Sequence, residues 1–273
     1  MIVAIALALA LADPVSPAPP AEPLAQLSLA EAGQAIAAGR LDQAKAMLSA
    51  AVAAGAKGDP VDRLLADLAL ARGENEQALS YYRALLGAHP DELLLLQRGG
   101  IAALRLGRNE EATALLDRAT RNPAAGWRAW NARGVAADRQ SRWDEADAAY
   151  QRAAALGPAS AEVPNNQGWS LMLRGRWDEA LAAFEKAAAI DPKVPHLANN
   201  LELARAAVAA DLPQRMAGES DAGFAARLND AGVVAAAGGQ SKRAEAAFAQ
   251  AIQLKSHWFG RAAENLAALG TTK

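Results

Sequence analysis

The chain has 273 residues, of which 52% are apolar and only 5% aromatic, and it contains no Cys. This apolar content supports a packed core and excludes a disordered chain, while the absence of Cys excludes disulfides and thiolate metal sites. The net charge of -2 disfavours a nucleic-acid partner, and three His far apart in the sequence offer few metal ligands.

The N-terminal segment differs in composition from the rest of the chain. Residues 2–12 form an unbroken apolar run that ends in an Ala-x-Ala pattern, and prolines follow it through Pro23. We interpret 1–12 as an export signal and 13–24 as an extended linker, with an uncleaved apolar tail as the alternative. The run is shorter than the ~18 residues that cross a bilayer, so no transmembrane span is expected. A periplasmic or secreted protein is therefore predicted, and the cytoplasm is the alternative compartment.

Internal repetition is the main pattern of the chain. Five consecutive blocks align without a gap at a period of 34 residues, and a sixth follows an interruption: 25–58, 59–92, 93–126, 127–160, 161–194 and 225–258. Midway through each block is a turn position, occupied by Gly39, Gly73, Gly107, Ser141, Gly175 and Gly239. Apolar residues recur at helical spacing on both sides of it. Each block is therefore predicted to be a pair of helices.

Two further positions characterise the blocks. A small position in the first helix holds Ala32, Ala66, Gly100, Gly134, Gly168 and Gly232. A large position in the second helix holds Leu48, Tyr82, Leu116, Tyr150, Phe184 and Phe248. Because glycine inside a helix costs about 1 kcal/mol relative to alanine, its recurrence predicts a close helix approach at which small residues meet small ones.

Acidic residues recur at the start of the second helix of five blocks, at Asp42, Glu76, Glu110, Asp144 and Asp178. Paired carboxylates of this kind can serve as catalytic acids and bases. Their repetition favours a different role, which is to complement the positive end of the helix dipole. With no phosphate loop, nucleophile motif or metal-ligand spacing found, we predict a chain that is not an enzyme, with no catalytic residues, cofactor or metal site.

The blocks resemble the tetratricopeptide repeat family, whose pattern is W-x2-L-G-x2-Y, then A-x3-F, then P. Two copies carry it well: Trp130, Gly134, Ala146, Tyr150 and Pro158, and then Gly168, Ala180, Phe184 and Pro192. The resemblance implies an all-α solenoid of stacked helical hairpins that forms a right-handed superhelix and binds a protein or peptide partner.

The last part of the chain departs from the regular period. Residues 195–224 are interpreted as an irregular half-repeat and loop, with Ser220 as the N-cap of the next helix. Residues 259–273 are interpreted as a C-terminal helix that covers the end of the stack and stops at Gly270. Trp143 and Trp177 are expected to pack between repeats, and Trp130 to lie in the core.

The candidate partner-binding residues lie on the first helices, which line the groove in this family. One column of equivalent positions ends in four asparagines, and two of these have a second asparagine beside them. Side-chain amides both donate and accept, so such a column can pair with the backbone of an extended peptide; the alternative is that it ties adjacent repeats together. The candidates, with two apolar neighbours, are Asn131, Asn165, Asn166, Asn199, Asn229, Trp169 and Met172.

A narrower resemblance concerns residues 160–235, where the doubled asparagines and a Leu-Pro loop are similar to TadD-type proteins. It implies a role in assembling the tight-adherence (Flp) pilus. The predicted function is a non-catalytic adaptor that holds an extended partner segment for an envelope machine. The alternatives are an oligomerising structural component that uses its convex or end surfaces, and a cytoplasmic regulator.

Overall fold

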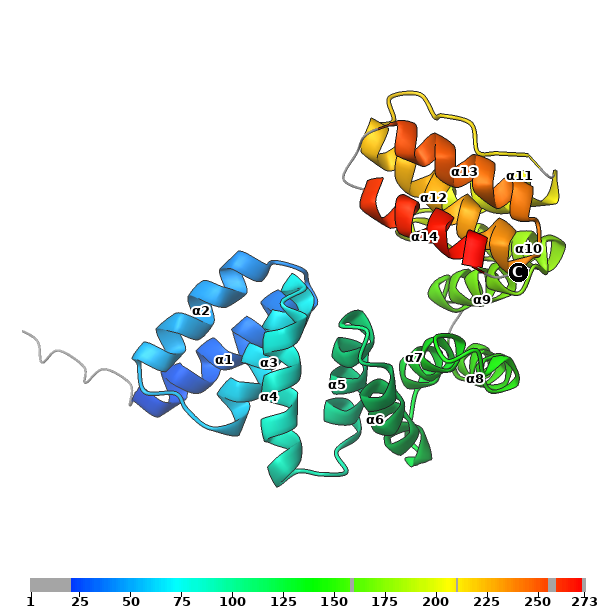
Figure 1. Ribbon diagram of the computed structural model, residues 1–273. Helices are drawn as coiled ribbons and strands as arrows, with labels where there is room; N and C mark the ends of the chain where they lie inside the picture. The colour runs from blue at the N-terminus through cyan, green and yellow to red at the C-terminus, as the bar shows by residue number, and fades with distance from the viewer. Residues whose placement is uncertain (1–20, 158–159, 210, 255–258, 272–273) are drawn as a thin grey trace, which may run out of the picture. The chain divides into compact units, whose positions relative to one another are not determined.

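The computed structural model describes residues 21–157, 160–209, 211–254 and 259–271. The proposed export segment 1–12, the linker up to residue 20 and Pro158 lie outside the described residues. The described part of the chain forms helices and no strand, which confirms the all-α class (Figure 1). The helices are α1 (Ala21–Ala37), α2 (Leu41–Ala53), α3 (Asp59–Arg72), α4 (Asn75–Ala88), α5 (Leu93–Arg105), α6 (Asn109–Arg121), α7 (Trp127–Asp138), α8 (Trp143–Leu156), α9 (Glu162–Leu173), α10 (Trp177–Ile190), α11 (Leu197–Val208), α12 (Asp221–Ala237), α13 (Ser241–Gln253) and α14 (Phe259–Thr271).

The chain divides into two compact units, Met1–Leu85 and Leu86–Lys273. In the first unit, small and aliphatic side chains from α1, α2 and α3 form one core cluster around Ala32, Ala44 and Leu48. Helix α1 begins at Ala21, so the expectation that 13–24 is extended is wrong for its last four residues. Pro23 lies in the first turn of α1, where a backbone N–H has no partner within the helix and proline is tolerated.

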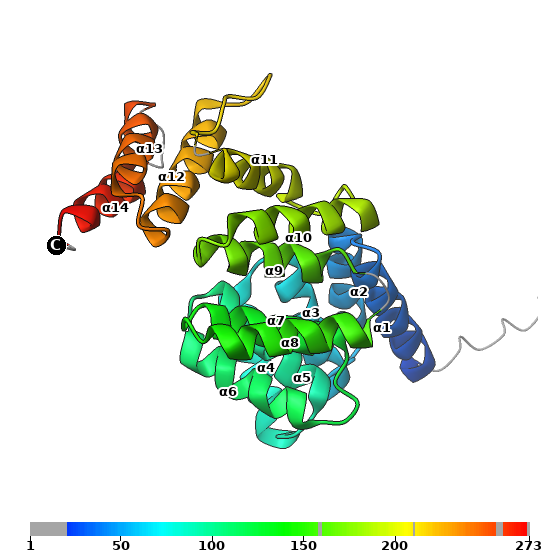
Figure 2. The same cartoon turned by 90° about the vertical axis from the view of Figure 1, so that its right-hand side faces the viewer.

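In the second unit, consecutive helices pair as antiparallel hairpins: α5 with α6, α7 with α8, α9 with α10, and α12 with α13. Figure 2 shows α9 and α10 alongside α7 and α8, and α9 contacts both of these helices. Each hairpin buries its apolar face against the next one, so the fold is an α-solenoid.

Within a hairpin, a small residue of the first helix packs against a large side chain of the second helix. A Cβ placed on Gly134 would lie 2.6 Å from the ring of Tyr150, and one on Gly168 would lie 2.7 Å from the ring of Phe184. Both rings are at most 1% exposed. The expectation that small residues meet small ones is therefore wrong: the small position of the first helix receives the large position of the second. Glycine is needed because a large ring fills the space that its side chain would occupy.

Local backbone conformation ends the first helix of each hairpin. The five glycines at the turn position have φ between 70° and 77°, in the left-handed region where glycine is unstrained. Ser141, the sixth residue at this position, adopts the same conformation with φ of 57°. The turn position thus separates the two helices, as predicted, and it does so through backbone geometry.

Tryptophans pack between neighbouring hairpins. A Cβ on Gly238, at the end of α12, would lie 2.5 Å from the indole of Trp177, which begins α10. Trp143 begins α8, and the guanidinium of Arg174 from the following hairpin lies 5.6 Å from its ring centroid. Trp130 packs against the buried cluster around Tyr150. The predicted packing of Trp143 and Trp177 between repeats is confirmed, whereas Trp130 is only partly buried and packs against the core rather than within it.

The irregular region contains one unpaired first helix, α11, followed by a loop that leads into α12. Ser220 caps α12 by accepting a hydrogen bond from the Gly223 backbone N–H at 3.1 Å, as predicted. Helix α14 covers α13 with Leu266 and Leu269 (Figure 1). Its predicted stop at Gly270 is wrong, because α14 continues to Thr271 and Gly270 does not adopt the left-handed conformation.

We expect Gly168→Ala to lower the free energy of unfolding by about 1–3 kcal/mol, because the added methyl group would overlap the Phe184 ring. The matched control is Gly87→Ala in α4, where a Cβ meets nothing within 4 Å. Alanine favours helices, so this control is expected to keep or raise stability. Urea unfolding followed by circular dichroism measures both; equal effects would contradict the interlock.

Candidate functional site

Side-chain amides link successive hairpins in the second unit. Asn166 donates to the side-chain oxygen of Asn131 at 3.2 Å, and Asn200 donates to that of Asn165 at 2.9 Å. Asn265 of α14 donates to Asn229 at 2.9 Å. The doubled asparagines therefore serve as donors to the column of the preceding hairpin. This is the arrangement expected if the column ties adjacent repeats together.

These links remove some candidates from the accessible surface. Asn131 is 8% exposed and Asn229 is 3% exposed, and Asn229 also hydrogen-bonds the carboxylate of Asp230. Met172 is 0% exposed, in a cluster with Phe184 and Val234. Its assignment to the groove is wrong, because α11 and α12 pack over this part of α9 and enclose the side chain.

The remaining candidates line a groove on the first helices. A cavity of about 390 Å³ is lined by Asn165, Asn166 and Trp169 of α9, together with residues of α7 and α11. A second cavity of about 410 Å³, lined by α9, α11 and α12, contains Asn199. The two adjoin, because both are lined by Trp169, His196 and Asn200. We call this combined surface the Trp169 groove.

Helical spacing explains which α9 residues reach the Trp169 groove. Asn165 and Asn166 precede Trp169 by four and three residues and therefore lie on one face with it. Leu173, four residues after Trp169, lines the groove in place of Met172. Leu173 could have been chosen from its spacing alone, whereas the burial of Met172 depends on helices that come later in the chain.

A polar network that sequence reasoning missed borders the groove. Tyr150 and Ser170 each donate a hydrogen bond of 2.6 Å to the carboxylate of Asp138. Arg174 donates to Ser170 at 3.2 Å and, at 2.7 and 2.8 Å, to the two oxygens of Asp147. Asp138 occupies in its block the position that Met172 occupies in the next one. The repeat pattern could therefore have identified Asp138 as a candidate. The network joins α7, α8 and α9 at the groove wall.

Burial and hydrogen bonding act in opposite directions on Asp138. Burial raises the pKa of its carboxyl, and the hydrogen bonds from Ser170 and Tyr150 oppose that rise without cancelling it. The hydrogen bonds from Arg174 lower the pKa of Asp147, which keeps this pair ionised. At the α7 and α9 end, the groove therefore has a partly buried carboxyl held by neutral donors beside a compensated ion pair.

A buried arginine forms the wall at the α12 end. Arg227 is 3% exposed, and it donates to Glu219 at 2.7 and 2.8 Å and to the carbonyl oxygen of Gln214 at 2.7 Å. It also pairs with Glu202 of α11. A buried charge is tolerated only when it is paired and hydrogen-bonded, so these contacts hold the loop 211–219 against α11 and α12.

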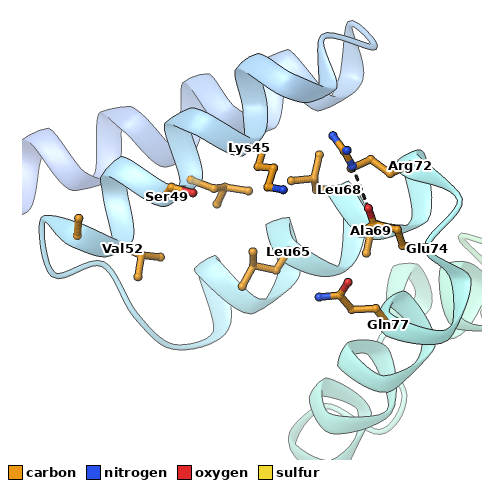
Figure 3. Close-up of a pocket in the computed structure, with 11 residues that line it drawn as sticks. Lys45, Ser49, Val52, Leu65, Leu68, Ala69, Arg72, Glu74 and Gln77 are labelled. Atoms are coloured by element: carbon orange, nitrogen blue, oxygen red, sulfur yellow. Dashed lines mark hydrogen bonds and ion pairs between the residues drawn. The ribbon is translucent and has the colours of Figure 1, made fainter.

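The first unit contains a different hollow of about 530 Å³ between α2 and α3 (Figure 3). Leu65, Leu68 and Lys45 project into it, and Val52 at its edge is 48% exposed. Arg72, which also lines it, is paired with Glu74 at 3.0 Å. Its walls suit an apolar side chain, but they lack the paired amides that could hold a peptide backbone.

Among the described residues, no group of three or more His, Asp or Glu side chains could hold a metal ion. No helix in that part of the chain is both long and apolar enough to cross a membrane.

Comparison with known proteins identifies the repeat. A family model described as tetratricopeptide repeat matches residues 29–92, 98–161 and 138–195, which together make up more than half of the chain. No curated protein matches the chain significantly.

Several solved structures share the fold. A thermophilic TPR protein from Thermus thermophilus is 24% identical with a TM-score of 0.56, over 68% of this chain and 99% of its own. PilW, a type IV pilus biogenesis factor, is 19% identical with a TM-score of 0.56, over 87% and 97%. A tetratricopeptide repeat protein from Parabacteroides merdae is 16% identical with a TM-score of 0.56, over 90% and 98%.

We expect Ser170→Ala to raise the pKa of Asp138 further, because the serine hydroxyl is a donor that stabilises the carboxylate. A carboxyl whose pKa is raised by folding destabilises the folded protein when it is ionised. The free energy of unfolding therefore falls as pH rises through that pKa. The variant should therefore lose about 1.5–3 kcal/mol near neutral pH and less at acidic pH, where the carboxyl is protonated in both proteins. Urea unfolding at several pH values measures this; a loss independent of pH would contradict it. Ser80→Ala, at an exposed serine of α4, is the matched control.

Proposed function

Because the chain belongs to the tetratricopeptide repeat family, whose members generally serve as protein-interaction scaffolds, we propose that it is a non-catalytic adaptor. Its ligand is an extended segment of a partner protein. The segment lies in the Trp169 groove, across the first helices α7, α9, α11 and α12.

This proposal depends on the amide groups of the groove that have a free donor or acceptor. Asn165 uses its side-chain oxygen and Asn166 its NH2 group in the links between hairpins. Within the described residues, the NH2 group of Asn165 and the oxygen of Asn166 have no partner, and both side chains are only partly buried. One donor and one acceptor are therefore held in place by the links, ready to pair with a peptide backbone.

Trp169 supplies the apolar part of the same site. Its indole is partly buried and lines both cavities of the groove. A fixed aromatic side chain offers a large contact area at small cost in conformational entropy. Alternate side chains of an extended segment would contact it while the backbone pairs with the amides.

The test is selection from a phage-displayed library of random linear peptides on the full chain. We expect the wild-type protein to enrich peptides that the double variant Asn165→Ala/Trp169→Ala binds at least about tenfold more weakly. Unfolding midpoints are measured alongside, because Asn165→Ala also removes the acceptor for Asn200.

The matched control is Leu156→Ala/Gln253→Ala, which removes an apolar and an amide side chain that are exposed and do not line the groove. It should leave peptide binding unchanged. Enriched peptides that bind both double variants equally well would refute the groove as the binding site.

We also propose that the adaptor is exported and helps to assemble an envelope machine such as a pilus. Support comes from the apolar run at 2–12, from the TadD-like residues 160–235, and from the fold shared with PilW, itself a pilus biogenesis factor. The 19% identity to PilW supports the fold rather than the role.

Export predicts that alkaline phosphatase fused after residue 24 becomes active in a bacterial periplasm. The apolar run drives translocation, so replacing two of its leucines, Leu7→Arg and Leu9→Arg, should abolish that activity. An active enzyme with the altered run, or an inactive one with the native run, would contradict export.

A further inference from the structure

Four of the five tryptophans in the described part of the chain each have an arginine beside the ring. Guanidinium groups lie 4.4 to 5.8 Å from the ring centroids of Trp127, Trp130, Trp143 and Trp177. In the described part of the chain, Trp169 has no such group over its ring, although it lines the groove. The aromatic face best placed for a ligand is thus also the one that no cation of the described residues covers.

A carboxylate lines the same cavity as this indole. Asp230 of α12 contributes to the cavity wall together with Trp169, and its carboxylate accepts a hydrogen bond from the neutral amide of Asn229. Arg261 and His196 act on Asp230 electrostatically, but more weakly than this amide does. The effect of burial on the pKa of Asp230 is larger than the opposing effects of Asn229, Arg261 and His196, so the pKa is raised. The negative charge of this carboxylate is therefore incompletely compensated by its neighbours.

The arginine of the cavity is already compensated. Arg227 is held by Glu202 and Glu219, so its charge is used in building the wall. Asn200 adds an acceptor, because its NH2 group is used by Asn165 while its oxygen has no partner among the described residues. The cavity therefore combines an aromatic face, a carboxylate and an amide oxygen, which are the groups that recognise a cationic N–H donor.

We propose that the α9, α11 and α12 part of the Trp169 groove is a subsite for a basic side chain, Arg or Lys, of the bound segment. The guanidinium or ammonium group stacks on Trp169 and donates to Asp230 and Asn200, while the segment's backbone pairs with the amides of α9. This inference rests on the proposed function, and it specifies that one residue of the bound segment has a positively charged side chain.

The probes are two short peptides of alternating Thr and Val that differ only at the centre, where one has Arg and the other has citrulline, its neutral isostere. Binding to the full chain is followed by the shift of the Trp169 indole N–H signal in NMR. We expect the Arg peptide to bind at least about tenfold more tightly than the citrulline peptide. A peptide with Lys at the centre should lie between them.

Asp230→Asn keeps the size of the side chain and an acceptor for Asn229, and it should reduce the Arg preference to about twofold or less. Asp178→Asn is the matched control, because Asp178 is an exposed carboxylate in the first turn of α10 and does not line the groove. It should retain the full preference.

Equal binding of the Arg and citrulline peptides would overturn the subsite, as would an Arg preference that survives Asp230→Asn. Failure of both peptides to bind at millimolar concentration would also overturn it. None of these results decides the groove proposal, which depends on the peptides selected from the library and on their loss in Asn165→Ala/Trp169→Ala.

Discussion

The close approach of a glycine to a large side chain inside each hairpin, Leu116 in α5 and α6 and an aromatic ring in the others, is the constraint on which the second unit depends. Gly134 and Gly168 let the rings of Tyr150 and Phe184 fill the space between paired helices, and both rings are fully enclosed. A packed ring of this size contributes about 1.5–3 kcal/mol through burial alone. Because the contact lies within one hairpin, it sets the spacing of the helices before neighbouring hairpins stack.

Stacking then places polar side chains from different hairpins beside each other. The Asn166 to Asn131 and Asn200 to Asn165 links join the first helices of successive hairpins. Each amide has both a donor and an acceptor, so one link leaves the other half of the group available. Structural and binding roles are therefore compatible in the same side chain, and the two interpretations of the column are not exclusive.

Charges around the groove differ in how far they are compensated. Arg174 is paired with Asp147, and Arg227 is paired with both Glu202 and Glu219, so these arginines are fully compensated and stiffen the groove walls. Asp230 has a neutral amide as its main compensation. Incomplete compensation of a partly buried charge costs stability in the free protein and can be recovered when a cation binds. This contrast separates the ion pairs that build the groove walls from Asp230, which lines the same cavity as Trp169 and can select a ligand.

The sequence by itself determined the all-α class, the helix pairs and the position of the turn between them, because helical periodicity and helix breaks depend on residues a few positions apart. The repeat positions in the sequence also identified four residues that line the groove: Asn165, Asn166, Asn199 and Trp169. Only the tertiary structure decided that Met172 is enclosed, that a glycine faces a ring, and that Asp230 lines the same cavity as Trp169. The positions of Met172 and Asp230 depend on helices far apart in the chain, and the glycine contact depends on how two consecutive helices pack; the local pattern specifies neither.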